Sequence, residues 1–315
     1  PFKNQIIVPP VVSFLSKDPL RLFFTLPKAI RKLHPDVVIE PAHFGPFNLP
    51  KKIKRVTVIH DLTPVMFPQW HNRLSSILQR IFLPSILKKA TLIITNSDNT
   101  SHDLTQTYPQ SEGKIARIYP SVDPFFQLKM EELVDEKQPF FLSVGTIEPR
   151  KNLSLLLDAY QLFREQTHFS HQLIICGGDG WKNTIFFEKL ENHPFKKDIQ
   201  WKGYVSREEL KQLYSNTTAF VYPSLYEGFG FPVAEAMGCG APCIVSNRSS
   251  LPEVGGDAVL YFDPEEKMDL VSKLIEVASS KNLVSSLGQR GNVRANSFSP
   301  ERFQSELEKF LIALK

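Results

Sequence analysis

Short apolar runs alternate along this chain with segments of helical spacing, and this alternation constrains the fold more than any other feature. Runs typical of β-strands lie at 37–39, 56–59, 92–95, 140–144, 173–176, 199–202, 219–222, 243–245 and 259–261. Helical patterns lie at 72–89 (interrupted at Pro84), 153–166, 207–214, after Pro232, and at 265–279, 283–294 and 301–314. Strands that alternate with helices are typical of a parallel sheet with helices on both faces. The sequence therefore predicts an α/β fold.

A polar and acidic segment without apolar periodicity, 129–138, divides this series in two. The chain has 315 residues, which is enough for two domains of ordinary size. We therefore predict a first domain over 1–128, a linker over 129–138 and a second domain over 139–299. In sheets of this kind, ligands bind beyond the carboxyl ends of the strands.

The composition is that of an ordinary globular protein, with 42% hydrophobic and 22% charged residues. Pro9 and Pro10 interrupt the early apolar run 5–15, and no run reaches the ~18–20 residues of a membrane-spanning helix. We find no secretory signal pattern and expect a cytoplasmic protein. The three cysteines lack metal-binding spacing, so we expect buried free thiols at Cys176, Cys239 and Cys243.

Charge is unevenly shared along the chain. Residues 1–126 contain 16 Lys and Arg against 8 Asp and Glu, whereas 127–315 contain 21 against 25. The early basic charge is concentrated at Arg31, Lys32, Lys51, Lys52, Lys54 and Arg55. These residues form either a solvated face or a patch that attracts an anionic membrane or a phosphorylated lipid acceptor. Nucleic acid is not supported as a partner, because aromatic residues do not interleave with the basic ones.

The stretch 227–242 combines two glutamates with a Gly-Phe-Gly-Phe-Pro turn. Pro232 suits the first turn of a helix, because its missing N–H would have no intrahelical partner there. Glu235 then lies one turn inside the helix, and Glu227 lies in the loop before it. The backbone amides of 228–231 would form an anion site at the helix N-terminus. Phosphate-binding amides beside two carboxylates suit a nucleotide sugar, whose hydroxyls the carboxylates can bind; the alternative is two solvated acids.

A second candidate anion site follows the strand 140–144. Gly145 ends that strand, Arg150 and Lys151 follow, and Asn152 opens a helix. Such a junction can hold a diphosphate between backbone amides and two cations. The alternative is a solvated basic pair, but cations at a helix start oppose the helix dipole, which favours a bound anion.

His60 and Asp61 end the strand 56–59, where functional groups of an α/β sheet belong. His60 is either catalytic or structural, whereas we expect Asp61 to orient the following loop. Ser206 and Glu209 have the spacing of a helix capping box. No Asp-x-Asp follows a cleft strand and the histidines are scattered, so the sequence predicts no metal site.

Four segments resemble, in the expected order, the retaining GT-B glycosyltransferases of family four, which carry an E-x7-E signature. They are 59–64 (Ile-His-Asp-Leu-Thr-Pro), 144–152 (Val-Gly-Thr-Ile-Glu-Pro-Arg-Lys-Asn), 222–232 with Glu235, and 251–256 (Leu-Pro-Glu-Val-Gly-Gly). The resemblance covers about residues 30–315. It implies two doubly wound Rossmann-like domains facing a cleft, an acceptor-side first domain and a nucleotide-sugar-binding second domain. It also implies that 300–315 crosses back to the first domain.

The resemblance assigns roles to individual residues. It implies that Glu235 binds the ribose, that Glu227 lies near the donor sugar and its leaving phosphate, and that backbone near Tyr204 meets the base. Lys151 matches the family's lysine, while Thr146 stands where the family has arginine, so Arg150 would substitute. The implied donor-binding residues are Gly145, Arg150, Lys151, Tyr204, Glu227, Phe229, Gly230, Phe231 and Glu235; the implied catalytic residues are His60, Glu227, Arg150 and Lys151.

The implied activity is metal-independent and cofactor-independent transfer of a hexose from a nucleotide diphosphate sugar to an acceptor hydroxyl with retention. The chain most resembles mannosyltransferase-like members, so GDP-mannose is the leading donor and a UDP sugar the next. Such proteins build surface polysaccharide, which fits a cytoplasmic protein at a membrane. The alternatives are a sugar-nucleotide epimerase, a phosphorylase or a non-catalytic nucleotide-sugar-binding protein.

The sequence departs from the family pattern at its start. Family members open with a strand and a Gly-rich loop, whereas the first glycine here is Gly45. We therefore expect a truncated sequence or a first domain that is shortened at its N-terminus.

Overall fold

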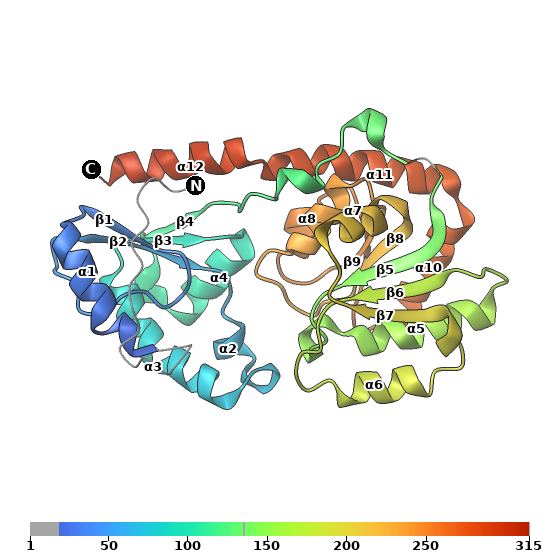
Figure 1. The fold of residues 1–315 in the computed structure, drawn as a ribbon, viewed down its shortest axis with the longest axis horizontal. Helices are drawn as coiled ribbons and strands as arrows, with labels where there is room; N and C mark the ends of the chain where they lie inside the picture. The colour runs from blue at the N-terminus through green and yellow to red at the C-terminus, as the bar shows by residue number, and fades with distance from the viewer. Residues whose placement is uncertain (1–18, 135, 315) are drawn as a thin grey trace. The chain divides into compact units, whose positions relative to one another are not determined.

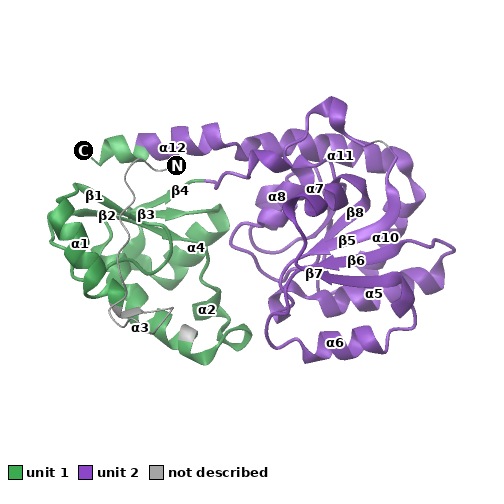
Figure 2. Ribbon diagram, in the orientation of Figure 1, with its two compact units in different colours: residues 1–118, 310–315 green, residues 119–309 purple. Residues whose placement is uncertain are grey.

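The computed structural model of this chain describes residues 19–134 and 136–314. They divide into two compact units (Figure 2). Unit 1 comprises the residues up to Ile118 together with those from Phe310 onward, and unit 2 comprises Tyr119–Lys309. The predicted shortening of the first domain concerns the opening segment, most of which lies outside the described residues.

Unit 2 contains a six-stranded parallel sheet with the order β10-β9-β8-β5-β6-β7. Its strands are β5 (Gln138–Val144), β6 (Gln172–Cys176), β7 (Ile199–Gly203), β8 (Thr217–Tyr222), β9 (Cys243–Ser246) and β10 (Leu260–Phe262). The chain runs outward from β5 to β7 and then returns to β8 on the other side of β5. The order therefore reverses between β5 and β8, and this switch point is where open α/β sheets bind ligands.

Helices cover both faces of this sheet (Figure 1). They are α5 (Leu153–Gln166), α6 (Thr184–Glu191), α7 (Arg207–Asn216), α8 (Phe231–Gly238), α9 (Leu251–Gly255), α10 (Lys267–Ser279) and α11 (Lys281–Ala295). Successive strand residues point to opposite faces. Phe141 and Val221 therefore pack in one core with α5 and α10, whereas Leu142 and Tyr222 pack in the other with α7 and α8.

Unit 1 contains a four-stranded parallel sheet in the order β1-β2-β3-β4. Its strands are β1 (Val37–Glu40), β2 (Lys54–Ile59), β3 (Leu92–Thr95) and β4 (Ile115–Arg117). Its helices are α1 (Thr25–Leu33), α2 (Thr63–Met66), α3 (Arg73–Lys89) and α4 (Asp98–Thr107). A small apolar core contains Ile59 of β2, Leu83 and Leu87 of α3, and Ile93 of β3.

The last helix and several 3-10 turns complete the chain. Helix α12 (Pro300–Ala313) begins in unit 2, and its final residues group with unit 1, where Lys54 Nζ donates a hydrogen bond to the carbonyl oxygen of Leu314. The 3-10 turns are Pro19–Leu22, Pro68–Trp70, Pro109–Ser111, Pro124–Phe126, Met130–Glu132, Pro149–Lys151, Lys196–Asp198 and Asn296–Phe298.

The doubly wound α/β fold predicted from the sequence is confirmed, with one difference at the boundary. The sequence assigns 119–128 to the first domain, whereas the structure groups these residues with unit 2. The physical reason is apolar packing, because Val122 and Phe126 are buried in the core of unit 2. The Val122 amide also donates a hydrogen bond to Phe298 O at 2.8 Å. The predicted linker contains a 3-10 turn and ends in the first residue of β5.

The predicted capping box at the start of α7 is formed only in part. Ser206 caps α7, since its Oγ accepts a hydrogen bond from the Glu209 amide at 3.1 Å. The Glu209 carboxylate does not close a capping box and instead lies 2.8 Å from Lys202 Nζ. Helices α1 and α6 were not among the predicted elements.

Candidate active site

The switch point of unit 2 brings together two loops that are distant in sequence. The loop after β5 forms the 3-10 turn Pro149–Lys151, and Asn152 then enters α5 in a left-handed conformation. The loop after β8 leads to Glu227 and α8. The Leu225 amide donates a hydrogen bond to Arg150 O at 2.8 Å, which fixes one loop against the other. The site thus forms where β5 and β8 lie side by side.

Four charged side chains, three of them buried and Arg150 partly buried, form a cluster between these loops, which we call the switch-point cluster: Glu148, Arg150, Lys151 and Glu227. Glu227 Oε1 lies 2.6 Å from Lys151 Nζ, and its Oε2 lies 2.6 Å from Arg150 Nη1. Arg150 Nη2 also lies 2.6 Å from Glu148 Oε1. The two cations share one carboxylate, and each donates a charge-assisted hydrogen bond to a different oxygen of it.

Burial and charge act in opposite directions on this cluster. Burial by itself would raise the pKa of Glu227, but the adjacent Lys151 and Arg150 outweigh it and lower that pKa to about 2. Burial lowers the pKa of Lys151, and the adjacent Glu227 opposes part of this change. Glu227 is therefore a carboxylate at neutral pH and a weak base.

Tyr222, at the end of β8, contacts the ammonium group of Lys151 through its hydroxyl and its ring. Lys151 Nζ donates a hydrogen bond to Tyr222 Oη at 2.6 Å and lies 4.9 Å from the centre of its ring. Burial raises the pKa of Tyr222, so its hydroxyl remains protonated. The sequence analysis assigned no role to Tyr222 or Glu148, although both lie inside the motifs that it singled out.

Two serines hold the Glu227 loop in place. Ser250 Oγ donates hydrogen bonds to Glu227 O and Phe229 O, both at 2.9 Å, and the Glu227 amide donates to Ser249 Oγ at 2.8 Å. Sequence reasoning missed both serines, and their position just before the 251–256 motif is the signal that could have indicated them. Gly230 adopts a φ of 105°, and a Cβ there would lie 2.8 Å from Leu251 Cδ2, so glycine is required.

Helix α8 begins at this loop, as predicted, with Gly230 at its N-cap and proline in its first turn. Phe229 is buried in the core, so only its backbone can meet a ligand, whereas Phe231 is exposed. Glu235 lies one turn into the helix, 3.4 Å from Tyr214 Oη. Burial raises the pKa of Glu235 to about 7, and the Tyr214 hydrogen bond opposes part of this shift.

Gly145 and Tyr204 lie at the same carboxyl edge of the sheet. The Gly145 amide donates a hydrogen bond to Cys176 O at 2.8 Å, and the Lys151 side chain passes beside Gly145. Tyr204 follows β7 with an exposed ring that lies against Gly178. Unit 2 therefore collects all of the predicted donor-binding residues around the carboxyl ends of β5, β7 and β8.

The predicted catalytic residue His60 lies in unit 1, at the carboxyl end of β2. Its side chain is exposed, and Nε2 lies 2.7 Å from Pro41 O. Its amide donates a hydrogen bond to His43 Nε2 at 3.0 Å. Asp61 accepts hydrogen bonds from the Thr63 amide and hydroxyl at 2.9 and 2.6 Å, which confirms its loop-orienting role. Because His60 and the switch-point cluster belong to different units, the catalytic role of His60 stays a prediction.

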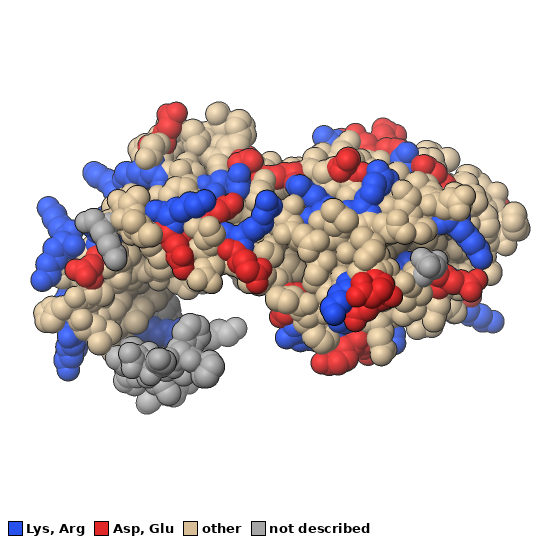
Figure 3. Space-filling model, turned by 90° about the horizontal axis from the view of Figure 1, so that it is seen from above, with Lys and Arg blue, Asp and Glu red and all other residues tan. Residues whose placement is uncertain are grey.

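One member of the predicted basic patch is not at the surface. Arg55 is buried, and its Nε donates a hydrogen bond to Glu40 Oε1 at 2.7 Å. Thr57 Oγ1 donates to the other oxygen of Glu40 at 2.7 Å. The prediction for Arg55 is therefore wrong, because an acidic partner from the neighbouring strand draws it inside. Lys51 and Lys52 are exposed, and Lys and Arg side chains line the edge of unit 1 in Figure 3.

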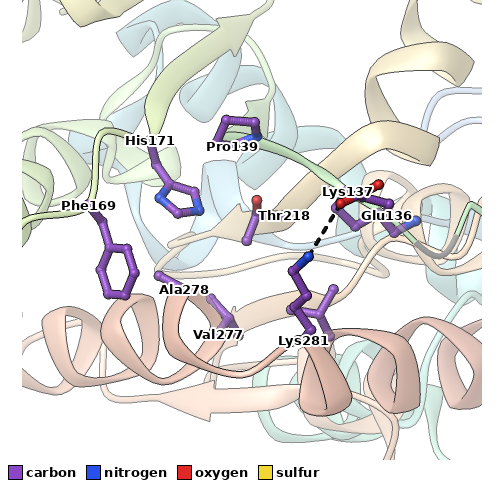
Figure 4. Close-up of a pocket in the computed structure, with 10 residues that line it drawn as sticks. Glu136, Lys137, Pro139, Phe169, His171, Thr218, Val277, Ala278 and Lys281 are labelled. Carbon is purple, nitrogen blue, oxygen red and sulfur yellow. Dashed lines mark hydrogen bonds and ion pairs between the residues drawn. The ribbon is translucent and has the colours of Figure 1, made fainter.

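A pocket of about 220 Å³ opens at the opposite, amino edge of the unit 2 sheet. Pro139 of β5, Thr218 of β8 and His171 line it, and Figure 4 shows Lys281 and Glu136 paired across one side at 3.3 Å. None of the predicted site residues lines this pocket. Since ligands of such sheets bind at the carboxyl edge, this pocket is separate from the candidate site.

Three further observations concern metal ligands, membrane-spanning helices and cysteines. In the part of the chain that the structure describes, no three His, Cys, Asp or Glu side chains are grouped as metal ligands would be. No helix within 19–134 and 136–314 is long and apolar enough to cross a bilayer. The three cysteines are buried and free, as predicted.

Comparison with known sequences shows the family of this chain. The family profile described as "Glycosyl transferases group 1" matches residues 125–294, and that described as "Glycosyltransferase Family 4" matches residues 2–125. The chain is 34% identical over 308 residues to the O-antigen chain mannosyltransferase B of Escherichia coli, covering 92% of this chain and 80% of that protein. It is 28% identical over 240 residues to the O-antigen chain mannosyltransferase RfbU of Salmonella typhimurium, covering 76% and 65%.

Comparison with solved structures supports the fold. The structure is similar to that of the sucrose-phosphate synthase from Thermosynechococcus elongatus, with a TM-score of 0.76 and 19% identity over 92% of this chain and 77% of that chain. It is also similar to TarM, with a TM-score of 0.72 and 17% identity over 92% of this chain and 57% of that chain.

Proposed function

This chain belongs to the group 1 glycosyltransferases and is an enzyme of the GT-B fold, and on that premise we propose that it transfers a hexose with retention and without a metal ion. The donor is a nucleotide diphosphate sugar, and the acceptor is a hydroxyl of a glycan or of a lipid-linked glycan. The switch-point cluster is the observation that carries this proposal. It puts two cations beside a helix N-terminus at the carboxyl edge of a doubly wound sheet.

The cations stabilise the leaving diphosphate. As the bond between the sugar C1 and the phosphate oxygen breaks, negative charge grows on the diphosphate. Lys151, Arg150 and the first-turn amides of α8 would stabilise that charge, and such groups stabilise it most when water is excluded. The donor phosphates would then compete with Glu227 for the two cations. Glu227, freed in part, would turn toward the hydroxyls of the sugar.

We propose that the acceptor attacks from the face that the diphosphate leaves. The acceptor oxygen forms the new bond to C1, and its proton moves to the departing phosphate oxygen. While Lys151 and Arg150 are paired with Glu227, its pKa is about 2 and it is a weak base, whereas the departing phosphate oxygen gains negative charge as its bond to C1 breaks and can accept that proton. Trapping a covalent glycosyl group on Glu227 would overturn the proposal. His60 would orient the donor sugar from unit 1.

The names of the relatives suggest the donor and the pathway. The two relatives above are named O-antigen chain mannosyltransferases. We therefore propose GDP-mannose as the donor and a growing surface polysaccharide as the acceptor, with the enzyme acting at the cytoplasmic face of a membrane. Glu235 would bind the ribose hydroxyls, and Tyr204 would border the base.

Calorimetry with GDP, UDP and ADP tests the donor site. We expect selective GDP binding that is unchanged by EDTA and is weakened in Lys151→Ala and Glu235→Ala. Lys196→Ala is the matched control, because Lys196 forms an exposed ion pair with Glu191 outside the site. Binding that EDTA abolishes would contradict metal independence. Binding of none of the three nucleotides would contradict the donor site itself.

A transfer assay with radiolabelled GDP-mannose tests the reaction. We expect mannosyl transfer to a lipid-linked glycan fraction, with α-linked product from an α-linked donor. Intact GDP binding with neither transfer nor donor hydrolysis would instead support a non-catalytic nucleotide-sugar-binding protein.

A further inference from the structure

Helix α3 of unit 1 presents a row of aliphatic side chains to solvent. The exposed fractions are 64% for Leu74, 52% for Ile77, 40% for Leu78 and 62% for Ile81. Their spacing of three, four and seven residues places them on one face of the helix. The helix lies at the lower edge of unit 1 in Figure 1. We call these four residues the α3 apolar face.

The opposite side of the same turns is polar although it is buried. Ser76 and Gln79 are buried, with exposed fractions of 4% and 8%. A surface helix of a globular protein normally has the reverse arrangement, with apolar residues inside. The second half of α3 follows the normal rule, since Leu83 and Leu87 are buried in the core. Packing among the described residues of unit 1 therefore does not account for the α3 apolar face.

The charge of α3 indicates what covers this face. The helix contains four basic residues and no acidic residue. Arg73 and Arg80 are exposed at the two ends of the face, where Arg80 Nη2 also donates a hydrogen bond to Val65 O at 3.0 Å, and Lys88 and Lys89 are exposed at the end of the helix. Lys88 continues the row, seven residues after Ile81. Aliphatic side chains with flanking cations and no acid are typical of a helix that lies in the interface of an anionic bilayer.

We propose that α3 docks this enzyme on an anionic lipid surface, with the α3 apolar face in the acyl boundary and its cations at the headgroups. Each cation near such a surface adds attraction to anionic lipid. Pairing of two copies through the same face is disfavoured, because eight cations would come together without an acidic partner. The helix has 17 residues and contains Pro84, and it lies on the membrane rather than across it.

The docking of α3 rests on the proposed function and adds the surface that meets the membrane. Membrane docking can fail while the proposed sugar transfer holds. Vesicle binding needs neither donor nor acceptor. The donor site is measured separately by GDP calorimetry, so a variant of α3 that loses vesicle binding should keep its nucleotide binding.

Vesicle flotation tests the proposal. We expect the protein to float with vesicles of equal parts phosphatidylglycerol and phosphatidylcholine and to remain unbound with pure phosphatidylcholine. The double variant Ile77→Gln, Ile81→Gln should lower the partition coefficient at least about tenfold, because two large aliphatic groups no longer enter the bilayer. Lys88→Gln with Lys89→Gln should weaken binding to the anionic vesicles and make it less sensitive to salt.

A matched control changes exposed apolar residues elsewhere. Ile185 and Met268 of unit 2 are exposed to a similar degree, and Ile185→Gln, Met268→Gln should leave flotation unchanged. Equal flotation of the control and the α3 double variant would overturn the proposal, as would absence of binding by the unaltered protein. A dimer in solution that the α3 double variant dissociates, without vesicle binding, would instead assign this face to self-association.

Discussion

Unit 1 and unit 2 each bury an arginine–glutamate pair, and the two pairs occupy different parts of a parallel sheet. Arg55 and Glu40 pair within β1 and β2, and Thr57 uses the second carboxylate oxygen. In unit 2, Arg150 and Glu227 pair on loops beyond the carboxyl ends of β5 and β8, and Lys151 shares the same carboxylate. The first pair has its carboxylate satisfied by its own sheet, whereas the second has two cations on one carboxylate.

The difference teaches that burial of a charge does not by itself indicate function. Both carboxylates are almost fully removed from solvent. The pair in unit 1 joins two adjacent strands and matches one cation to one carboxylate, so we assign it to the fold. The cluster in unit 2 lies where a doubly wound sheet binds ligands, so an incoming anion can replace the shared carboxylate. Changes that remove one partner should therefore affect stability in one unit and activity in the other.

Removal of the unit 1 cation should have the largest effect on stability. Arg55→Met leaves Glu40 buried without a cation, and we expect the free energy of unfolding of unit 1 to fall by about 3–5 kcal/mol. Denaturant unfolding followed by hydrogen exchange in β1 and β2 measures this loss. GDP binding by the folded protein should be unchanged. A loss of GDP affinity without a loss of stability would instead assign the unit 1 pair to ligand binding and not to the fold.

Removal of the unit 2 lysine should act mainly on catalysis. Lys151→Met leaves Glu227 paired with Arg150, so the fold loses little. The negative charge that grows on the diphosphate in the transition state loses one hydrogen-bond donor. We therefore expect kcat/KM to fall by about 100- to 1,000-fold. Steady-state transfer kinetics measure this, with Lys189→Met as the control because Lys189 forms a half-exposed ion pair with Asp158. Unfolding of the Lys151 variant with kcat/KM preserved per folded molecule would make the cluster structural.

A smaller effect should follow removal of the hydroxyl under the lysine. Tyr222→Phe deletes one hydrogen bond to Lys151, and we expect kcat/KM to fall several-fold with a stability loss of about 0.5–1.5 kcal/mol. Tyr160→Phe is the matched control, because the Tyr160 hydroxyl donates to His171 O at 2.7 Å near the amino edge. The control should lose similar stability and no activity. Equal kinetics for the two variants would exclude Tyr222 from positioning Lys151.

The smallest expected effect is on the pH dependence of stability, through the carboxyl group of Glu235 in α8. Burial raises the pKa of Glu235 from 4.5 to about 7 in the folded state. The folded protein therefore holds this proton more tightly than the unfolded chain, and the resulting stability declines as pH rises from about 4.5 through about 7. Glu235→Gln should remove that decline in thermal unfolding of unit 2 relative to the exposed control Glu276→Gln. Parallel stability curves for both variants and the unaltered protein would contradict the raised pKa.

Much of the fold could be predicted because strand and helix periods are local properties. The helix 153–166 has the predicted bounds, and the strand after it differs by one residue. Gly145, Arg150 and Lys151 could be assigned to one functional loop because a strand, a glycine and a helix start follow each other directly. The same reasoning found Glu227 and Glu235 on either side of the α8 N-terminus.

The errors concern side chains whose partners are distant in the sequence. Arg55 was assigned to a surface patch because its neighbours in the chain include lysines, but its ion pair with Glu40 on the adjacent strand β1 holds it inside. Residues 119–128 were assigned to the first domain because the polar segment follows them, but Val122 packs in unit 2. The reversed faces of α3 were not recognised either, because a helical period indicates an apolar side and not which way that side points.

The sequence by itself therefore determined the elements, their alternation and the residues at the strand ends, since backbone geometry sets those periods within a few residues. Only the tertiary structure decided which strand ends meet. Arg150 and Glu227 are 77 residues apart and pair because the chain returns to place β8 beside β5. Strand order is a property of the whole packed sheet, and it is this order that assembled the switch-point cluster.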